Sequence, residues 1–209
     1  MRILVISEGK HELNHKTRAS KTSGALVQLV LRILNHPQAI ENLSVEWQDT
    51  RSFGVITRPD WGTGGADYKR KAMSWIRRAE NEKYDAIVIV VDQDNAPDRR
   101  EGLDGAQVDA RLSLPRAIGL AVKSFDAWML ADEQAISKAI GRTIQTQRQP
   151  EGHKSPKDQM ETIIANCDGM SEVYSRIAEE ARIQTLCTRC PKGFRPFHDR
   201  VAKLVAPAR

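Results

Sequence analysis

The most informative segment of the chain is Tyr84-Asp-Ala-Ile-Val-Ile-Val-Val-Asp-Gln-Asp94. Its apolar part is continuous and rich in β-branched residues, which is typical of a strand buried on both faces at the centre of a parallel sheet. Residues 3–7 (Ile-Leu-Val-Ile-Ser) and 118–122 (Ile-Gly-Leu-Ala-Val) have the same character, and residues 43–47 and 53–57 are weaker strand candidates. The sequence therefore predicts several buried strands.

Segments with helical periodicity separate these strands. Residues 23–34 and 68–82 place apolar side chains three and four positions apart. We expect a loop at residues 95–103, a short helix at 108–114, and one helix from Ser124, its N-cap, to about residue 140. This alternation predicts an α/β fold, a mostly parallel, Rossmann-like sheet flanked by helices.

The strand signal disappears after Gly141. Residues 142–155 are a polar connection, a helix is expected to begin at Pro156, and two more are expected around residues 171–184 and 194–205. We therefore predict an α/β core at residues 1–140 and a helical C-terminal extension, residues 141–209, packed on it.

Composition narrows the class of protein. No apolar run approaches the ~20 residues of a membrane helix, and three cysteines do not indicate a secreted disulfide framework. We expect a cytoplasmic protein without membrane contact. The net charge is +5, and residues 182–209 hold seven basic residues and one acidic residue. That segment is either a phosphate-contacting surface or a solvated helix face.

Three carboxylates follow two of the predicted strands. Glu8 comes directly after residues 3–7, and Asp92 and Asp94 end the strand at residues 84–91. If the two strands are neighbours, their carboxyl ends bring these side chains to one crevice. Their repulsion would favour a bound Mg²⁺ or Mn²⁺, which can activate water for phosphodiester hydrolysis. The alternative is that these acids are turn formers and helix caps.

Other polar segments have two interpretations each. The basic stretch after Glu8 is either a phosphate-binding entrance or a solvated loop; it contains Lys10, His11, His15, Lys16, Arg18 and Lys21. Residues 61–65 (Trp-Gly-Thr-Gly-Gly) either cradle a phosphate or form a plain loop, and they lack the spacing of a P-loop. Cys187 and Cys190 have the spacing of half a zinc knuckle or are ordinary buried thiols. Lys192 and Arg195 could direct cations at the crevice and stabilise transition-state charge.

These motifs resemble the TOPRIM domain of topoisomerases, primases and OLD-type nucleases, whose signature is one Glu and an Asp-x-Asp pair that bind Mg²⁺. The chain is more closely similar to a small bacterial TOPRIM-like family of unknown function, over nearly its whole length. The similar elements are Glu8-Gly-Lys-His-Glu12, Asp92-Gln-Asp94, Phe125-Asp-Ala-Trp-Met-Leu-Ala-Asp132, Pro156-Lys157 and Cys190-Pro-Lys-Gly-Phe-Arg-Pro-Phe197.

The resemblance implies a Mg²⁺-dependent (or Mn²⁺-dependent) nuclease that cuts DNA or RNA, works with an ATPase encoded nearby and defends against phage. Its catalytic residues would be Glu8, Asp92, Asp94 and Lys192, and its metal ligands Glu8, Asp92, Asp94 and Asp126. Lys10, Lys16, Arg18, Lys21, Lys123 and Arg195 would bind the nucleic acid. A homo-oligomer is also possible.

One departure from the family pattern is Lys123, which stands where relatives commonly have an acidic residue. Either Asp126 takes over that role, or Lys123 replaces a second metal as a fixed cation. The alternative function is therefore a non-catalytic regulatory subunit that binds nucleic acid or an ATPase through a degenerate TOPRIM site. A small-molecule phosphotransfer enzyme is a third possibility.

Overall fold

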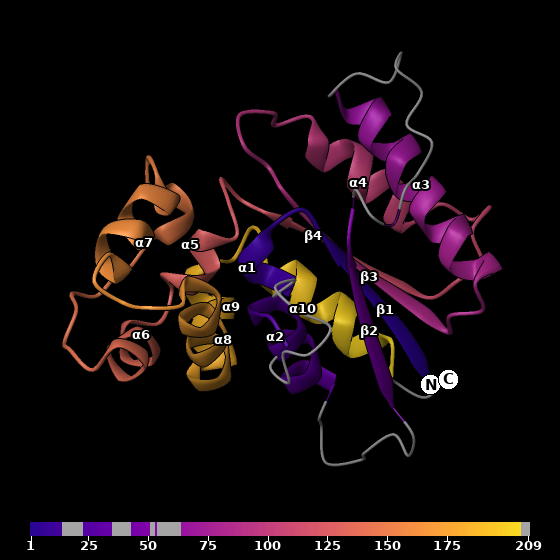
Figure 1. Ribbon diagram of the computed structural model, residues 1–209. Coiled ribbons are helices and arrows are strands. Elements are labelled where there is room, and N and C mark those ends of the chain that lie inside the picture. Colours follow the sequence, from indigo (N-terminus) through magenta and orange to yellow (C-terminus); the bar gives the residue numbers. More distant parts are fainter. Residues whose placement is uncertain (14–22, 35–42, 51–52, 54–63, 206–209) are drawn as a thin grey trace.

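The protein is built on one parallel sheet (Figure 1). The computed structural model describes residues 1–13, 23–34, 43–50, 53 and 64–205. The strands are β1 (Arg2–Ser7), β2 (Ser44–Asp49), β3 (Ala86–Asp92) and β4 (Arg116–Ala121), in the order β2-β1-β3-β4. All pairings are parallel, which confirms the predicted α/β fold. Of the strand candidate at residues 53–57, only Phe53 is described, and it lies in a turn.

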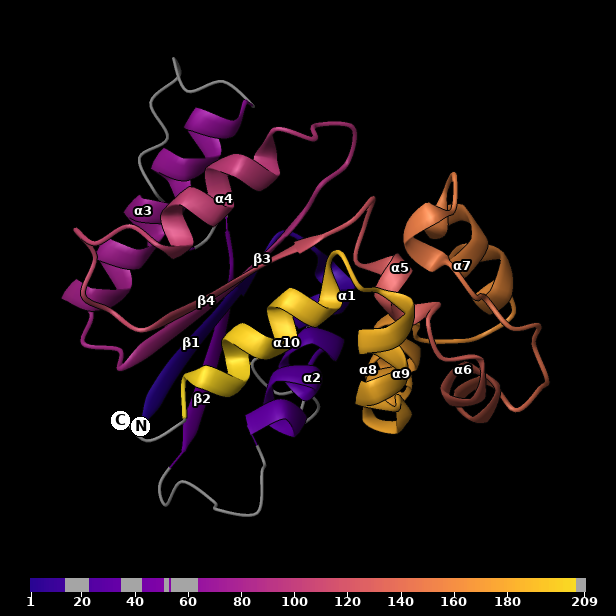
Figure 2. The same cartoon turned by 180° about the vertical axis from the view of Figure 1, so that it is seen from behind.

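Helices cover both faces of the sheet (Figure 2). On one face, Leu4 and Ile6 pack in the cluster formed by α3 (Gly65–Asn81) and α4 (Arg99–Gln107). On the other, Ile3 and Val5 pack in the cluster that contains α2 (Ala25–Leu34) and α10 (Phe194–Lys203). Both sides of β1 are therefore buried, which explains its unbroken apolar sequence.

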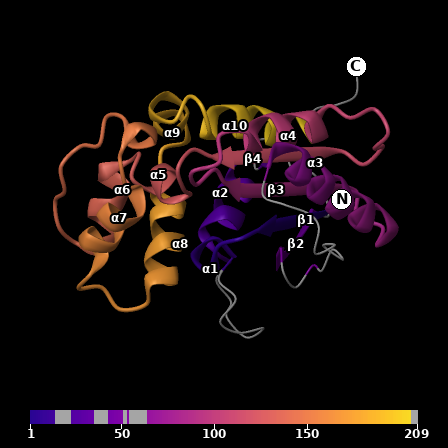
Figure 3. The same cartoon turned by 90° about the horizontal axis from the view of Figure 1, so that it is seen from above.

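The remaining helices gather beyond the carboxyl ends of the strands (Figure 3). In chain order, these are α1 (Lys10–Leu13), α5 (Asp126–Met129), α6 (Glu133–Ile140), the 3₁₀ helix η1 (Pro150–Gly152), α7 (Pro156–Ile164), α8 (Met170–Glu180) and α9 (Ile183–Arg189). The predicted helix start at Pro156 is confirmed. The helix expected at 171–184 instead ends at Glu180, and α9 follows as a separate helix.

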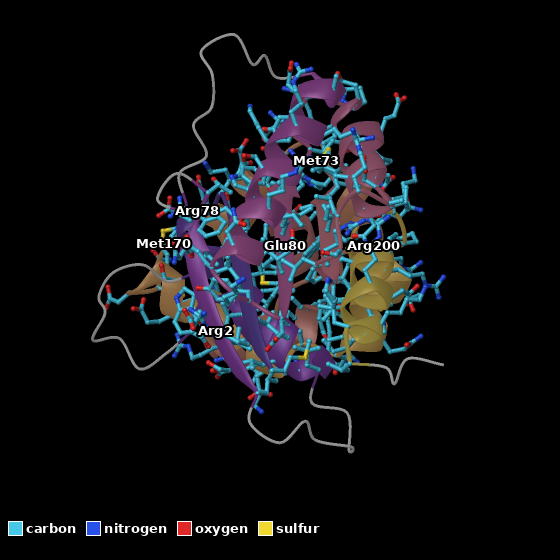
Figure 4. The ribbon with its side chains drawn as sticks, turned by 90° about the vertical axis from the view of Figure 1, so that its right-hand side faces the viewer. Arg2, Met73, Arg78, Glu80, Met170 and Arg200 are labelled. Carbon is cyan, nitrogen blue, oxygen red and sulfur yellow. The ribbon has the colours of Figure 1, made fainter. Side chains whose placement is uncertain are left out.

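The C-terminal segment is packed into the core. Phe197 on α10 stacks on Trp128 of α5 with ring centroids 5.2 Å apart, and Gly119 leaves room for it, because a Cβ there would lie 2.7 Å from the Phe197 ring. Arg200 of α10, labelled in Figure 4, donates to the Ile118 carbonyl of β4 and pairs with Asp104 of α4. Residues from both predicted parts share one hydrophobic cluster, while their division at residue 140 stays a prediction.

The prediction of a loop at 95–103 and a helix at 108–114 was wrong. The helix is α4, at Arg99–Gln107, and residues 108–114 have no helix. Leu112 and Leu114 are buried, but from an irregular segment. The Arg116 guanidinium satisfies carbonyl groups of this segment, including those of Asp109, Leu112 and Leu114, so the segment needs no helical bonds.

The prediction of one continuous helix from Ser124 to residue 140 was also wrong. The helix is interrupted between α5 and α6, because the Asp132 carboxylate accepts the N–H groups of Gln134 and Ala135 and so caps a new helix. Ser124 is not an N-cap; its hydroxyl donates to Asp126 at 2.9 Å.

The close crossing of α3 and α4 gives a stability test with a matched control. A Cβ on Gly102 would overlap the carbonyl group of Gly65, whereas a Cβ on Gly105 would come no closer than 3.4 Å to the flexible Lys69 side chain. We expect Gly102→Ala to lower the free energy of unfolding by ~1–3 kcal/mol. Gly105→Ala should raise it by ~0.5–1 kcal/mol, because alanine is the better helix former. Urea denaturation measures both, and equal effects would contradict this packing.

Candidate active site

The pairing of β1 with β3 brings the predicted acids together. Ser7 is opposite Val90, and its hydroxyl donates to the Val90 carbonyl at 3.1 Å. Glu8 follows Ser7, while Asp92 ends β3. The two strands are therefore neighbours, as the shared crevice requires, and their acids leave the same edge of the sheet.

Five carboxylates at this edge influence one another and are called the acidic cluster: Glu8, Glu12, Asp92, Asp94 and Asp126. Burial, together with the charges of Asp126, Asp94 and Glu8, raises the pKa of Asp92 to about 7. Burial also raises the pKa of Glu12 well above its usual value, and Asp92 adds to the effect. Glu8 is accessible at the surface, yet partial desolvation of its carboxylate raises its pKa as well. Burial and mutual repulsion therefore disfavour the ionised forms of these carboxylates.

Three of these carboxylates have specific partners. Asp92 Oδ1 accepts the N–H of Phe125 at 2.8 Å, at the start of α5. Asp94 has a left-handed φ of 49° and is paired with Arg99 at 2.7 Å. Asp126 accepts the Ser124 hydroxyl and the Tyr174 hydroxyl. The Asp92 carboxylate therefore also organises local backbone, as the turn-and-cap interpretation expects, whereas the Asp94 carboxylate binds a side chain.

Arg99 is the buried cation of the site. One of its terminal nitrogens donates to both the Asp92 carbonyl and the Asp94 carboxylate, at 2.7 Å each. The guanidinium lies over the Tyr68 ring, 4.4 Å from its centroid, and the Tyr68 hydroxyl is 3.5 Å from Glu8 Oε1. Arg99 Nε is buried without an acceptor among the described residues. Arg99 thus compensates part of the negative charge.

Sequence reasoning did not identify Arg99, Glu12 or Tyr174 as site residues. Arg99 lies in the segment expected to be a loop, and the available signal was an arginine five positions after Asp94. Glu12 is the second glutamate of the Glu8-Gly-x-x-Glu12 motif and is only 6% exposed. Tyr174 has no local signal, because it reaches Asp126 from α8, 48 positions away.

A stacked pair extends the site toward α8. The His11 ring of α1 stacks on Tyr174 with centroids 5.1 Å apart, and His11 Nδ1 lies 2.9 Å from the Ser171 hydroxyl. Burial and the neighbouring Asp126 raise the pKa of Tyr174, so its hydroxyl remains protonated and donates. The C-terminal extension therefore supports a carboxylate of the acidic cluster.

Of the predicted nucleic-acid-binding residues in this part of the chain, the structure describes Lys123 and the backbone of Lys10. Lys123 has a left-handed φ of 66°, and its carbonyl accepts the Asp94 N–H at 3.0 Å, which places its backbone beside the acidic cluster. Lys10 begins α1. Lys16, Arg18 and Lys21, together with His15 and most of the glycine loop at 61–65, lie outside the described residues.

The two cations of the C-terminal motif have other neighbours. The carbonyl of Lys192, a predicted catalytic residue, accepts a bond from Arg100 at 3.0 Å, while its side chain is exposed. Arg195 is exposed on the first turn of α10 and acts electrostatically on the Cys187 thiol. Within the described ranges, neither side chain forms an ion pair or a hydrogen bond with a carboxylate of the acidic cluster.

The possible metal ligands differ in chemistry. Burial raises the pKa of the Cys187 and Cys190 thiols, which disfavours the thiolate that zinc requires. The acidic cluster offers hard oxygen atoms. As positioned, however, no three His, Cys, Asp or Glu side chains of the described chain are close enough to hold a metal ion. In this arrangement, the negative charge of the acidic cluster is reduced by the raised pKa of Asp92 and by the pairing of Arg99 with Asp94.

Comparisons of the chain with family models, curated proteins and solved structures found no match. In the part of the chain that the structure describes, no helix has the length and apolar character of a membrane span.

The raised pKa of Asp92 predicts a pH-dependent stability. Between about pH 4 and pH 7 the folded protein retains a proton that the unfolded chain, with an ordinary aspartate pKa, has released. The free energy of unfolding should therefore fall as the pH rises through this range.

Asp92→Asn should remove that contribution and still accept the Phe125 N–H. We expect its melting temperature to equal that of the wild type near pH 4 and to exceed it by several °C above pH 7. Thermal melts across this range, without divalent ions, measure the difference, with Asp168→Asn as an exposed control. Parallel curves for wild type and Asp92→Asn would disprove the raised pKa.

Proposed function

We propose that this protein is a Mg²⁺- or Mn²⁺-dependent nuclease that hydrolyses phosphodiester bonds of DNA or RNA. The observation that carries the proposal is the acidic cluster at the carboxyl edge of a parallel sheet, with raised pKa values at Glu8, Glu12 and Asp92. Structural carboxylates usually have lowered pKa values because they are paired, as Asp109 is with Arg111. Crowded acids at a crevice are typical of functional sites.

The oxygen donors of the acidic cluster are of the chemical type that suits a hard divalent cation. Glu8, Glu12 and Asp92 would hold it after moving closer together than they lie here, since Asp94 is paired with Arg99 and Asp126 is bonded to Ser124 and Tyr174. Asp94 would become a further ligand if Arg99 turned to the substrate. When bound, such an ion polarises a phosphoryl oxygen and lowers the pKa of a coordinated water.

The remaining residues would orient the carboxylates and stabilise the charge of the substrate phosphate. Tyr174 fixes the rotamer of Asp126, and Asp92 holds the start of α5 through the Phe125 N–H. Arg99 Nε is a buried donor without an acceptor among the described residues, and it would reach an anionic oxygen if Arg99 turned to the substrate. Lys123, on the backbone next to Asp94, supplies a second cation for the substrate phosphate.

Cleavage of labelled DNA and RNA tests this function. Wild type should cut with Mg²⁺ or Mn²⁺ and not with EDTA, and Asp92→Asn should cut at least ~100-fold more slowly, because loss of an outer-shell partner alone costs 10–100-fold. Asp168→Asn should cut normally. The assay is run alone and with any ATPase encoded beside the protein, because the family resemblance implies such a partner and a role in phage defence. Wild-type rates in Asp92→Asn would refute the site.

The second candidate is a non-catalytic regulatory subunit that binds nucleic acid or an ATPase. The Arg99–Asp94 pair favours it, since Arg99 already offsets part of the charge that a metal would neutralise. Lys123 also favours it, because it stands where the resembling family commonly has an acidic residue.

A metal titration separates the two candidates. For the nuclease we expect Mg²⁺ to raise the melting temperature at pH 8, by an amount equivalent to ~2.7 kcal/mol at one hundred times the Kd. Glu8→Gln should lose most of this shift, and Glu172→Gln, which changes an exposed glutamate on α8, should keep it. The absence of any shift in the wild type would support the regulatory subunit.

A further inference from the structure

A polar pocket lies between η1 and the turn that joins α9 to α10. Its volume is about 450 Å³, and Arg148, Glu151, Arg189 and Lys192 are among the residues that line it. The turn is held tightly, because the Glu151 carboxylate accepts the N–H groups of Lys192 and Gly193 at 3.0 and 2.6 Å. Gly193 admits no side chain, since a Cβ would lie 2.9 Å from the Leu120 carbonyl oxygen. The pocket is thus part of the ordered fold.

The charges lining this pocket do not balance. Glu151 is only 9% exposed, and both of its oxygens accept bonds from the backbone. Arg189 is paired with Glu133. Arg148 and Lys192 are exposed, and neither forms an ion pair within the described residues. The pocket therefore presents two cations to an anion with several acceptor oxygens, such as a phosphate group.

The pocket and the acidic cluster border the same end of the sheet. Arg99 binds Asp94, and its neighbour Arg100 donates to the Lys192 carbonyl at 3.0 Å. In addition, α5, which begins with Asp126, contacts η1. The α9–α10 turn, yellow in Figure 2, lies near α5 at the end of β4. One extended polymer could therefore reach both places.

We infer that this pocket binds a backbone phosphate of the nucleic-acid strand whose scissile phosphate lies at the acidic cluster. The inference rests on the proposed function and assigns Lys192 to strand binding, with Arg148 as its partner. A second basic pocket, on α3, fits this role less well. Its Arg70 is paired with Asp67, and its Lys69 and Arg111 are paired with Asp109, so Arg77 is its one lining cation without an ion pair among the described residues.

Salt-dependent binding tests the inference. The probe is a fluorescein-labelled single-stranded 12-mer, in EDTA to prevent cleavage, with Kd measured from about 50 to 200 mM KCl. In the Arg148→Ala/Lys192→Ala double variant, the slope of log K against log[salt] should decrease in magnitude by about 1.4, or ~0.7 for each lost phosphate contact. Affinity at the lowest salt should fall roughly tenfold.

The matched control is Arg77→Ala/Lys203→Ala, which removes two exposed cations, Arg77 of the rival pocket on α3 and Lys203 of α10. Its slope should change less than half as much, and circular dichroism checks that both variants fold. An unchanged slope in the pocket variant, or no binding by the wild type, would overturn the inference. So would a mononucleotide that competes as strongly as the 12-mer, since the pocket would then serve free nucleotides.

The outcomes separate this inference from the nuclease proposal. A pocket variant that binds and cuts like the wild type refutes the pocket and leaves the nuclease intact. A pocket-dependent salt slope combined with normal cutting by Asp92→Asn supports the pocket and refutes the proposed catalytic site.

Discussion

The parallel pairing of β1 with β3 is the constraint on which the candidate site depends. It places the backbone of Glu8 beside the end of β3, so acids more than eighty positions apart in the chain share one low-dielectric edge. The hydrophobic faces of β1 enforce this pairing, since Ile3, Leu4, Val5 and Ile6 are fully buried between two helical layers. A shift of one residue in register would exchange the two faces, so packing and site geometry are fixed together.

Crowded carboxylates need compensation, and the fold supplies it in several ways. Burial raises the pKa of Asp92 to about 7, which retains its proton up to that pH, and it also raises the pKa of Glu12 well above its usual value. Arg99 neutralises Asp94, and the Tyr174 hydroxyl donates to Asp126. Because Arg99 belongs to α4 and Tyr174 to α8, elements on opposite sides of the cluster converge on it. A divalent ion would perform the same compensation more strongly, which is the physical basis of the proposed nuclease.

The sequence predicted the sheet well because its signals are local. Strands β1, β3 and β4 are short apolar runs, and the acids that end β1 and β3 follow from strand ends alone. What escaped prediction depends on tertiary contacts. The sequence of residues 108–114 has a helical pattern, but the Arg116 guanidinium bonds to carbonyl groups of this segment and it stays irregular. Asp132 caps a new helix within the apolar pattern that predicted one continuous helix. Arg99 and Tyr174 reach the acids only after α4 and α8 have packed on the core. Lys123 stands where the resembling family commonly has an acidic residue. Its carbonyl is held next to Asp94 by a backbone hydrogen bond that no sequence pattern indicates.

The central claim is that the carboxylates lie close enough to repel one another and that a bound divalent cation neutralises this repulsion. Carboxyl ¹³C NMR of the folded protein, titrated with and without Mg²⁺, tests it most directly. The account predicts that Asp92 titrates near pH 7 without metal, and that saturating Mg²⁺ shifts its midpoint down by more than ~2 units, because a bound cation favours the ionised form. A midpoint near 4 that Mg²⁺ leaves unchanged would contradict it.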